Sequence, residues 1–304
     1  MRLFLLPIST RRTLLYCQKL DVTAPGAKES LSERVQAKAA KTWAGWEAKE
    51  SGWQKTVVNY GNKALRRIPY EEWGLKSVPP LSERLKREET KEASGMGKVE
   101  VVFPQSLIPK DRVSDVLRRL ATEREALHRK RLIYCIVGMP ISAPVALIPV
   151  VPNIPFFYLV YRAWSHWRAI AGGKHVQFLL KNNLLDLQPS PIVDAVYAGQ
   201  EPPLESTPKP TTTPESDLAK EITPFPPPAI EPPYPDGETM LLTQENGKKM
   251  TQALDLPQLE VELERAIWQV ETAIKKANEG VEAKRSEDMK EAEAVRDEEK
   301  KKAQ

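Results

Sequence analysis

The sequence predicts a mainly α-helical, membrane-anchored protein, and three observations carry this prediction. Residues 132–161 form an apolar run without a single charged side chain. Helical spacing of apolar residues marks stretches on both sides of this run. Fourteen of the 27 prolines lie in residues 189–235, a density that indicates a disordered linker rather than a packed domain. The expected order is therefore a helical region, a membrane segment, a linker and a C-terminal helix.

Composition and charge exclude several classes of protein. The two cysteines, Cys17 and Cys135, exclude a disulfide-stapled secreted fold, and together with three scattered histidines they give no metal or cofactor spacing. No combination of side chains indicates catalysis, so we expect a protein that is not an enzyme. The net charge of +4 hides a half of +14 in residues 1–188 and a half of −10 in residues 189–304. The basic half also carries many acids, which argues against nucleic-acid binding.

Residues 1–27 are typical of a mitochondrial targeting segment. The first 20 residues hold four basic side chains among Leu, Ser and Thr, and the first acid is Asp21. An ordinary basic N-terminus is the alternative, and cleavage of the segment stays open.

Residues 28–131 are expected to form a basic, Trp-rich helical domain. Apolar residues recur at helical spacing over residues 28–66, and four tryptophans lie between Trp43 and Trp73. Burial of these indoles within the domain and docking at a membrane interface are both open. A short β-branched stretch over residues 98–103 predicts a strand, and Asp111 opens a further helix with a basic face.

The apolar run 132–161 is long enough to cross a membrane, but its prolines rule out one straight helix. Two geometries remain: a helical hairpin that turns near residues 150–155, and a single kinked span. Basic side chains flank both ends of the run, which favours the hairpin under the positive-inside rule. The prolines expected to shape the segment are Pro140, Pro144, Pro149, Pro152 and Pro155.

Residues 162–188 are expected to form an aromatic and basic helix at the membrane interface. His166 and His175 fit surface or interfacial positions better than ligand positions. The predicted interfacial belt consists of Tyr158, Tyr161, Arg162, Trp164, Trp167 and Arg168.

Beyond this helix, residues 189–257 predict a Pro-rich disordered linker and residues 258–304 a charged amphipathic helix. Apolar residues of this helix alternate spacings of four and three, which is the lower limit for a coiled coil. Self-association, docking to a partner and packing against the basic half are equally open. The predicted stripe is Leu263, Ile267, Val270, Ile274 and Val281.

Three stretches of the chain together resemble the mitochondrial K+/H+ exchange-related family of fungal proteins. They are the opening MRLFLLPISTRRTLLYC, the Trp-bearing TWAGWEAKESGWQKTVVNYGNKALRRIPYEEWGLKS and the Pro-rich block LIYCIVGMPISAPVALIPVVPNIPFFYLVYRAWSHWRAIAGGKHVQFLL. The resemblance implies an inner-membrane protein that supports potassium–proton exchange and organelle volume, within large complexes that include LETM-type proteins. It implies no catalytic residue. The resemblance also includes the first seventeen residues. These residues are therefore either part of the retained structure or a targeting segment that is removed.

We therefore expect a non-enzymatic accessory or assembly subunit of the mitochondrial inner-membrane exchange system. Proton transport normally needs an ionisable group at membrane depth, and residues 132–161 supply none. The alternatives are an oligomeric pore-forming subunit, in which carbonyls freed by proline would bind potassium, and a general membrane scaffold. The expected partners are membrane lipids, other inner-membrane proteins and further copies of the chain.

Overall fold

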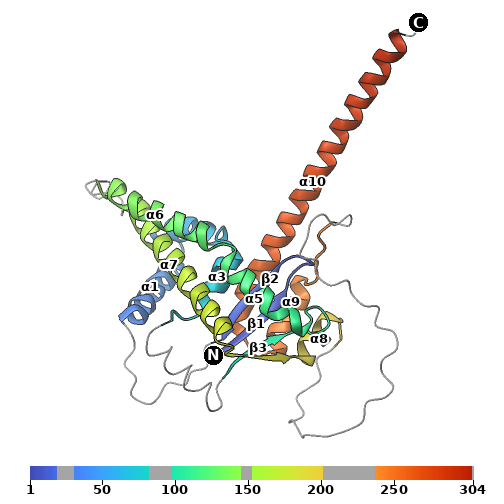
Figure 1. Ribbon diagram of the computed structural model, residues 1–304. Helices are drawn as coiled ribbons and strands as arrows, with labels where there is room; N and C mark the ends of the chain where they lie inside the picture. The colour runs from blue at the N-terminus through green and yellow to red at the C-terminus, as the bar shows by residue number, and fades with distance from the viewer. Residues whose placement is uncertain (19–30, 82–97, 145–152, 201–236, 303–304) are drawn as a thin grey trace, which may run out of the picture. The chain divides into compact units, whose positions relative to one another are not determined.

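The computed structural model describes residues 1–18, 31–81, 98–144, 153–200 and 237–302 (Figure 1). These residues form two compact units, and the N-terminal strands contribute to both. In chain order the elements are β1 (Arg2–Pro7), β2 (Thr13–Gln18), α1 (Leu31–Glu47), α2 (Trp53–Arg66), α3 (Tyr70–Ser77), β3 (Val99–Phe103), η1 (Lys110–Arg112), α5 (Val113–Thr122), α6 (Glu125–Ser142), α7 (Ile154–Lys181), β4 (Leu185–Pro189), α8 (Pro191–Tyr197), α9 (Gln244–Ala253) and α10 (Pro257–Lys302).

A four-stranded sheet with the order β2-β1-β3-β4 contains the extreme N-terminus. β1 pairs in parallel with β3, and Leu3 lies opposite Val101. Every residue of β1 after Arg2 is buried, whereas β3 alternates buried and half-buried positions. Arg2 donates to Glu100 across the pair at 2.6 Å. The segment predicted to target the protein therefore supplies two strands of the sheet.

The first unit consists of residues 1–4, 15–102 and 114–187. α3 and α6 both pack against α7, and α1 packs against α2. The contact between α3 and α7 is close, because a Cβ added at Gly172 would lie only 2.0 Å from the backbone oxygen of Leu75. α7 begins at a defined cap, where the Asn153 side chain accepts a hydrogen bond from the Phe156 N–H and a proline follows.

The second unit consists of residues 5–14, 103–113 and 188–304. α9 packs against both α8 and α10, and the Thr243 hydroxyl caps α9 by accepting from the Asn246 N–H. The Tyr197 hydroxyl donates to the Pro7 carbonyl at 2.7 Å, which ties α8 to the last residue of β1. An antiparallel bridge between Ser9 and Met240 brings the chain back to the turn between β1 and β2.

The predicted fold class is wrong in two respects, although helices do account for most of the described residues. The first is the mixed sheet, of which only the strand over residues 98–103 was predicted and is confirmed as β3. The second is the membrane segment. Among the described residues, no helix combines the length and the apolar character that crossing a bilayer requires.

The described part of the apolar run is divided between α6 and α7, and both helices also carry charged side chains. α6 and α7 run antiparallel, and Gly138 on α6 lies against Leu159 on α7. α6 carries three consecutive basic residues, 129–131, before the run, and α7 continues from Arg162 into a polar packed region. Neither the predicted hairpin through a membrane nor the kinked single span describes this arrangement.

Other predicted boundaries also shift. The stretch with helical spacing over residues 28–66 contains two helices: α1 ends at Glu47, and α2 begins after its N-cap residue Gly52, whose φ is 108°. The interfacial helix expected over residues 162–188 is the C-terminal part of α7, and β4 follows it. The linker expected over residues 189–257 contains α8 and α9, while its most Pro-rich part, 201–236, lies outside the described residues.

Candidate functional site

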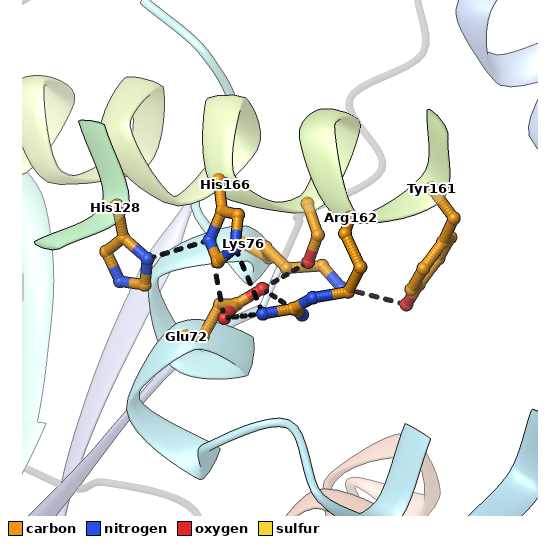
Figure 2. A network of polar contacts seen from close by, with 7 residues as sticks. Glu72, Lys76, His128, Tyr161, Arg162 and His166 are labelled. Atoms are coloured by element: carbon orange, nitrogen blue, oxygen red, sulfur yellow. Dashed lines mark hydrogen bonds and ion pairs between the residues drawn. The ribbon is translucent and has the colours of Figure 1, made fainter. Parts of the chain in front are cut away.

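A buried network of ionisable side chains joins α3, α6 and α7 (Figure 2). α3 contributes Glu72 from its first turn, and α6 contributes His128. α7 contributes Arg162, Ser165 and His166, which stand on one helix face because they are three and four residues apart. Each of these five side chains belongs to a residue with no more than 8% of its surface exposed.

Glu72 and Arg162 form the centre of the network as a bidentate ion pair. Arg162 Nη1 donates to Glu72 Oε1 at 2.8 Å, and Arg162 Nη2 donates to Oε2 at 3.1 Å. The Ser165 hydroxyl adds a third hydrogen bond to Glu72 Oε1 at 2.5 Å. The carboxylate itself is fully buried. Two parallel N–H···O bonds of this kind fix orientation as well as charge, so the pair holds α3 and α7 in register.

Two histidines extend the network from α7 to α6. His166 Nδ1 lies 3.1 Å from His128 Nδ1 and 3.7 Å from Glu72 Oε2. On its other side, His166 Nε2 lies 3.1 Å from Arg162 Nη2. The guanidinium only donates hydrogen bonds, so His166 Nε2 accepts and the proton of a neutral His166 sits on Nδ1. That proton is donated to His128 Nδ1, which places the His128 proton on Nε2.

The pKa directions agree with these protonation states. Burial lowers the pKa of His166 from 6.5 to about 4, against the opposing effect of Glu72. Burial likewise lowers the pKa of His128, and nearby Arg124 adds to this effect. Burial by itself raises the pKa of Glu72, but the hydrogen bond from Ser165 and the charge of Arg162 outweigh it, so this pKa lies below 4.5. Near neutral pH the network is one ion pair beside two neutral rings.

A second buried cation lies one turn along α3. Lys76 Nζ stands 3.4 Å from the centre of the Trp73 ring and 5.3 Å from those of Tyr161 and Trp164. It also donates to the Tyr161 hydroxyl at 3.3 Å. Arg168 on α7 donates to the Lys76 carbonyl at 3.0 Å. Cation–π contacts in a desolvated setting are favourable, and here they join α3 to α7 a second time.

Glu72, His128 and His166 are also residue types that bind metal ions, and one ligand atom from each lies within 4.8 Å of the others. Two features argue against a divalent cation in this position. The proton on His166 Nδ1 occupies the lone pair that a metal would need. Arg162 already neutralises Glu72, so a divalent ion would bring two uncompensated positive charges into a buried site. The arrangement is that of a structural charge network.

The sequence prediction placed these residues differently. Arg162 was assigned to a membrane-interface belt, but its guanidinium lies in the network, and His166 and His175 are buried rather than at a surface. Tyr161, Trp164 and Arg168 surround or contact Lys76, whereas Tyr158 and Trp167 remain about half exposed.

The predicted prolines and the C-terminal stripe are also placed by the structure. Pro140 lies inside α6, Pro144 just beyond it and Pro155 in the first turn of α7, while Pro149 and Pro152 lie outside the described residues. The stripe on α10 divides into two parts. Leu263, Ile267 and Val270 are buried, with the first two beside Gly247 of α9, whereas Ile274 is half-buried and Val281 exposed.

Sequence reasoning missed Glu72 and His128 altogether. The available signal was the Arg162–His166 pair at helical spacing, together with an acid in the first turn of a short helix. Nothing in the sequence brings these positions together, because Glu72 and Arg162 are 90 residues apart.

Comparison with known proteins places the chain in a family. The chain belongs to the mitochondrial K+-H+ exchange-related family, whose pattern matches residues 2–180 and so covers the whole network. An uncharacterized protein of Schizosaccharomyces pombe is 30% identical over 190 residues, which are 62% of this chain and 80% of that one. An uncharacterized protein of Saccharomyces cerevisiae is 26% identical over 203 residues, which are 60% of this chain and 63% of that one. No solved structure matches the chain. The family relates the protein to mitochondria and to K+-H+ exchange.

Proposed function

We propose that this protein is a non-enzymatic accessory or assembly subunit of the potassium–proton exchange system of the mitochondrial inner membrane. The observation that carries the proposal is the match of the family to residues 2–180, the part of the chain that holds α3, α6 and α7 together through buried charges. In this role the protein supports exchange, and thereby organelle volume, by holding other components in place.

The chemistry of the buried network supports an accessory role over a proton-carrying one. A proton carrier needs a group that gains and loses a proton near the working pH. Glu72 stays ionised because Arg162 and Ser165 stabilise its charge, and His166 stays neutral because its pKa is about 4. Residues 132–161 add no ionisable side chain apart from Tyr and Cys.

The expected partners are other inner-membrane proteins, LETM-type proteins among them, and membrane lipids. The far part of α10 offers one surface for a protein partner, since Val281 and Met289 are exposed there at 68% and 66%. Its surroundings are densely charged, which suits a partner helix with complementary charges.

The test is potassium-driven swelling of mitochondria that lack the protein. We expect swelling in potassium acetate to slow and to recover when an ionophore that exchanges K+ for H+ is added. Unchanged swelling would overturn the role in exchange. A second measurement separates accessory subunit from exchanger: vesicles that contain the purified protein alone should show no K+-dependent proton flux. Flux from the protein alone would show that it is the exchanger itself.

A further inference from the structure

One face of α2 carries exposed aromatic and basic side chains. Trp53 is 53% exposed and Tyr60 is 72% exposed, so two large rings face outward about two helical turns apart. At 3.6 residues per turn, all exposed positions of this face lie within an arc of about 80°. We call it the aromatic stripe, and in order along the helix its members are Trp53, Thr56, Tyr60, Lys63 and Arg67.

The other side of α2 packs on α1, so the aromatic stripe faces away from that contact. The Trp43 ring lies against Gly61, where an added Cβ would come within 2.3 Å of the ring. Asn62 accepts a hydrogen bond from Trp43 Nε1 at 3.3 Å and donates to Glu47 Oε1 at 2.9 Å. Val58, on the same side, is fully buried. These contacts fix which face of α2 is left for a partner.

The chemistry of the aromatic stripe suits an acidic, Pro-rich peptide. Residues 53–67 contain two Lys and two Arg and no acidic side chain, so an acidic occupant is complementary in charge. Exposed aromatic rings are the surfaces on which Pro-rich peptides dock, because the polyproline II conformation is preformed and loses little entropy on binding. A single row of side chains also suits one extended chain better than the broad plane of a membrane.

The chain itself contains such a peptide in residues 201–236, which lie outside the described residues. This segment holds 12 prolines, seven acidic residues and two lysines. Its net charge of −5 is opposite to that of α2. Within it, Pro224 and Pro227 have the spacing of a PxxP motif, and Glu231 follows them.

The spacing of these three residues matches the aromatic stripe. At 1.5 Å per residue along α2, Tyr60 and Arg67 lie roughly 10 Å and 21 Å from Trp53. A polyproline II helix rises about 3.1 Å per residue, so the second proline and the glutamate would lie roughly 9 Å and 22 Å from Pro224. Laid parallel to α2, the peptide would place one proline on each ring and its carboxylate beside a guanidinium.

We propose that residues 224–231 of the same chain dock on the aromatic stripe, with the two prolines on Trp53 and Tyr60 and the glutamate beside Arg67. The inference goes beyond the proposed function and does not depend on it. It gives the Pro-rich segment a binding site on α2, where the sequence alone predicted a linker.

Photocrosslinking in the purified full-length chain tests the contact. A Thr56→p-benzoylphenylalanine variant places the reactive group between the two rings, and mass spectrometry identifies what the group captures. We expect capture of residues 224–231 in a product that migrates as a monomer. The matched control Trp268→p-benzoylphenylalanine, at a 50% exposed position of α10, should not capture these residues.

Replacement of prolines tests the spacing. In the crosslinking variant, Pro224→Ala/Pro227→Ala should lower the crosslink yield roughly tenfold, because both ring contacts are lost. High salt should lower the yield as well, since the charges are exposed. The control Pro202→Ala/Pro203→Ala removes two prolines of the same segment outside the motif and should leave the yield unchanged. Equal yields from the two double variants would overturn the assignment of the motif.

Three other results would also overturn the proposal. Crosslinks only to other parts of the chain, or no crosslink at all, would remove the contact. A product with the size of two chains would make a second copy the occupant. Capture of lipid instead of residues 224–231, in the presence of vesicles of phosphatidylcholine and cardiolipin, would make a membrane surface the occupant.

Discussion

Replacing Glu72 with glutamine should destabilise the protein more than any change to a surface ion pair. The substitution keeps the size of the side chain and removes its charge. Arg162, whose side chain is 9% exposed, then keeps a buried positive charge without a counter-ion. His166 and His128 cannot supply one, because an imidazole is either neutral or positively charged.

The expected loss is about 3–5 kcal/mol in the free energy of unfolding, the usual cost of removing one partner of a buried ion pair. Glu72 accepts three hydrogen bonds from Arg162 and Ser165, which argues for the upper part of that range. The double variant Glu72→Leu/Arg162→Met removes both charges and should recover most of the loss, since apolar replacement of a buried pair is often neutral or stabilising.

The assay is urea unfolding followed by circular dichroism, with Glu123→Gln as the matched control. Glu123 pairs with Arg119 at 3.2 Å, but both side chains are more than half exposed, so its loss should cost less than about 0.5 kcal/mol. A loss below about 1 kcal/mol for Glu72→Gln would refute the reasoning. It would mean either that Glu72 is already protonated or that α3 is not held to α7 by this pair.

Three further predictions concern the same unit. The free energy of unfolding should fall as the pH drops from 6.5 to about 4, because His166 in the unfolded chain then binds a proton that buried His166 does not. The loss is on the order of 3 kcal/mol. A His166→Gln variant should show a flatter pH profile in thermal unfolding. Gly172→Ala should lower the unfolding midpoint, since the new Cβ would meet the Leu75 carbonyl, whereas Gly45→Ala on α1 meets nothing within 4 Å and should leave the midpoint unchanged or raise it. Addition of Zn2+ in slight excess should leave the thermal midpoint unchanged, and a rise that disappears in a His128→Ala variant would show that the network binds metal after all.

The sequence by itself determined the composition-level features of this protein. The uncharged run 132–161, the opposed charges of the two halves and the resemblance to the exchange-related family all depend on residue type and order alone. The strand at residues 98–103 was also predictable, because this short stretch is rich in β-branched residues. These features are local, so they can be found without knowing which distant segments meet.

For two local features, the structure differs from what the sequence predicted. The first 18 residues have the composition of a targeting segment, yet they form β1 and β2, since their Leu and Phe side chains are buried in the sheet. The uncharged run has the hydrophobicity of a membrane span, yet its described residues belong to α6 and α7, two helices that also carry charged side chains. The composition of a segment shows how apolar it is. It does not show which distant part of the chain packs against the segment and buries it.

The candidate site depended entirely on tertiary structure. From the sequence, Arg162 and His166 were predicted to lie at a membrane interface, because aromatic residues flank them. Their actual partners are Glu72, 90 residues away from Arg162, and His128, 38 residues away from His166. A buried charge is stable only beside its counter-charge, and a buried imidazole keeps one tautomer only where its neighbours donate and accept in the right places. Those conditions arise when α3, α6 and α7 pack together, and no stretch of the sequence contains them.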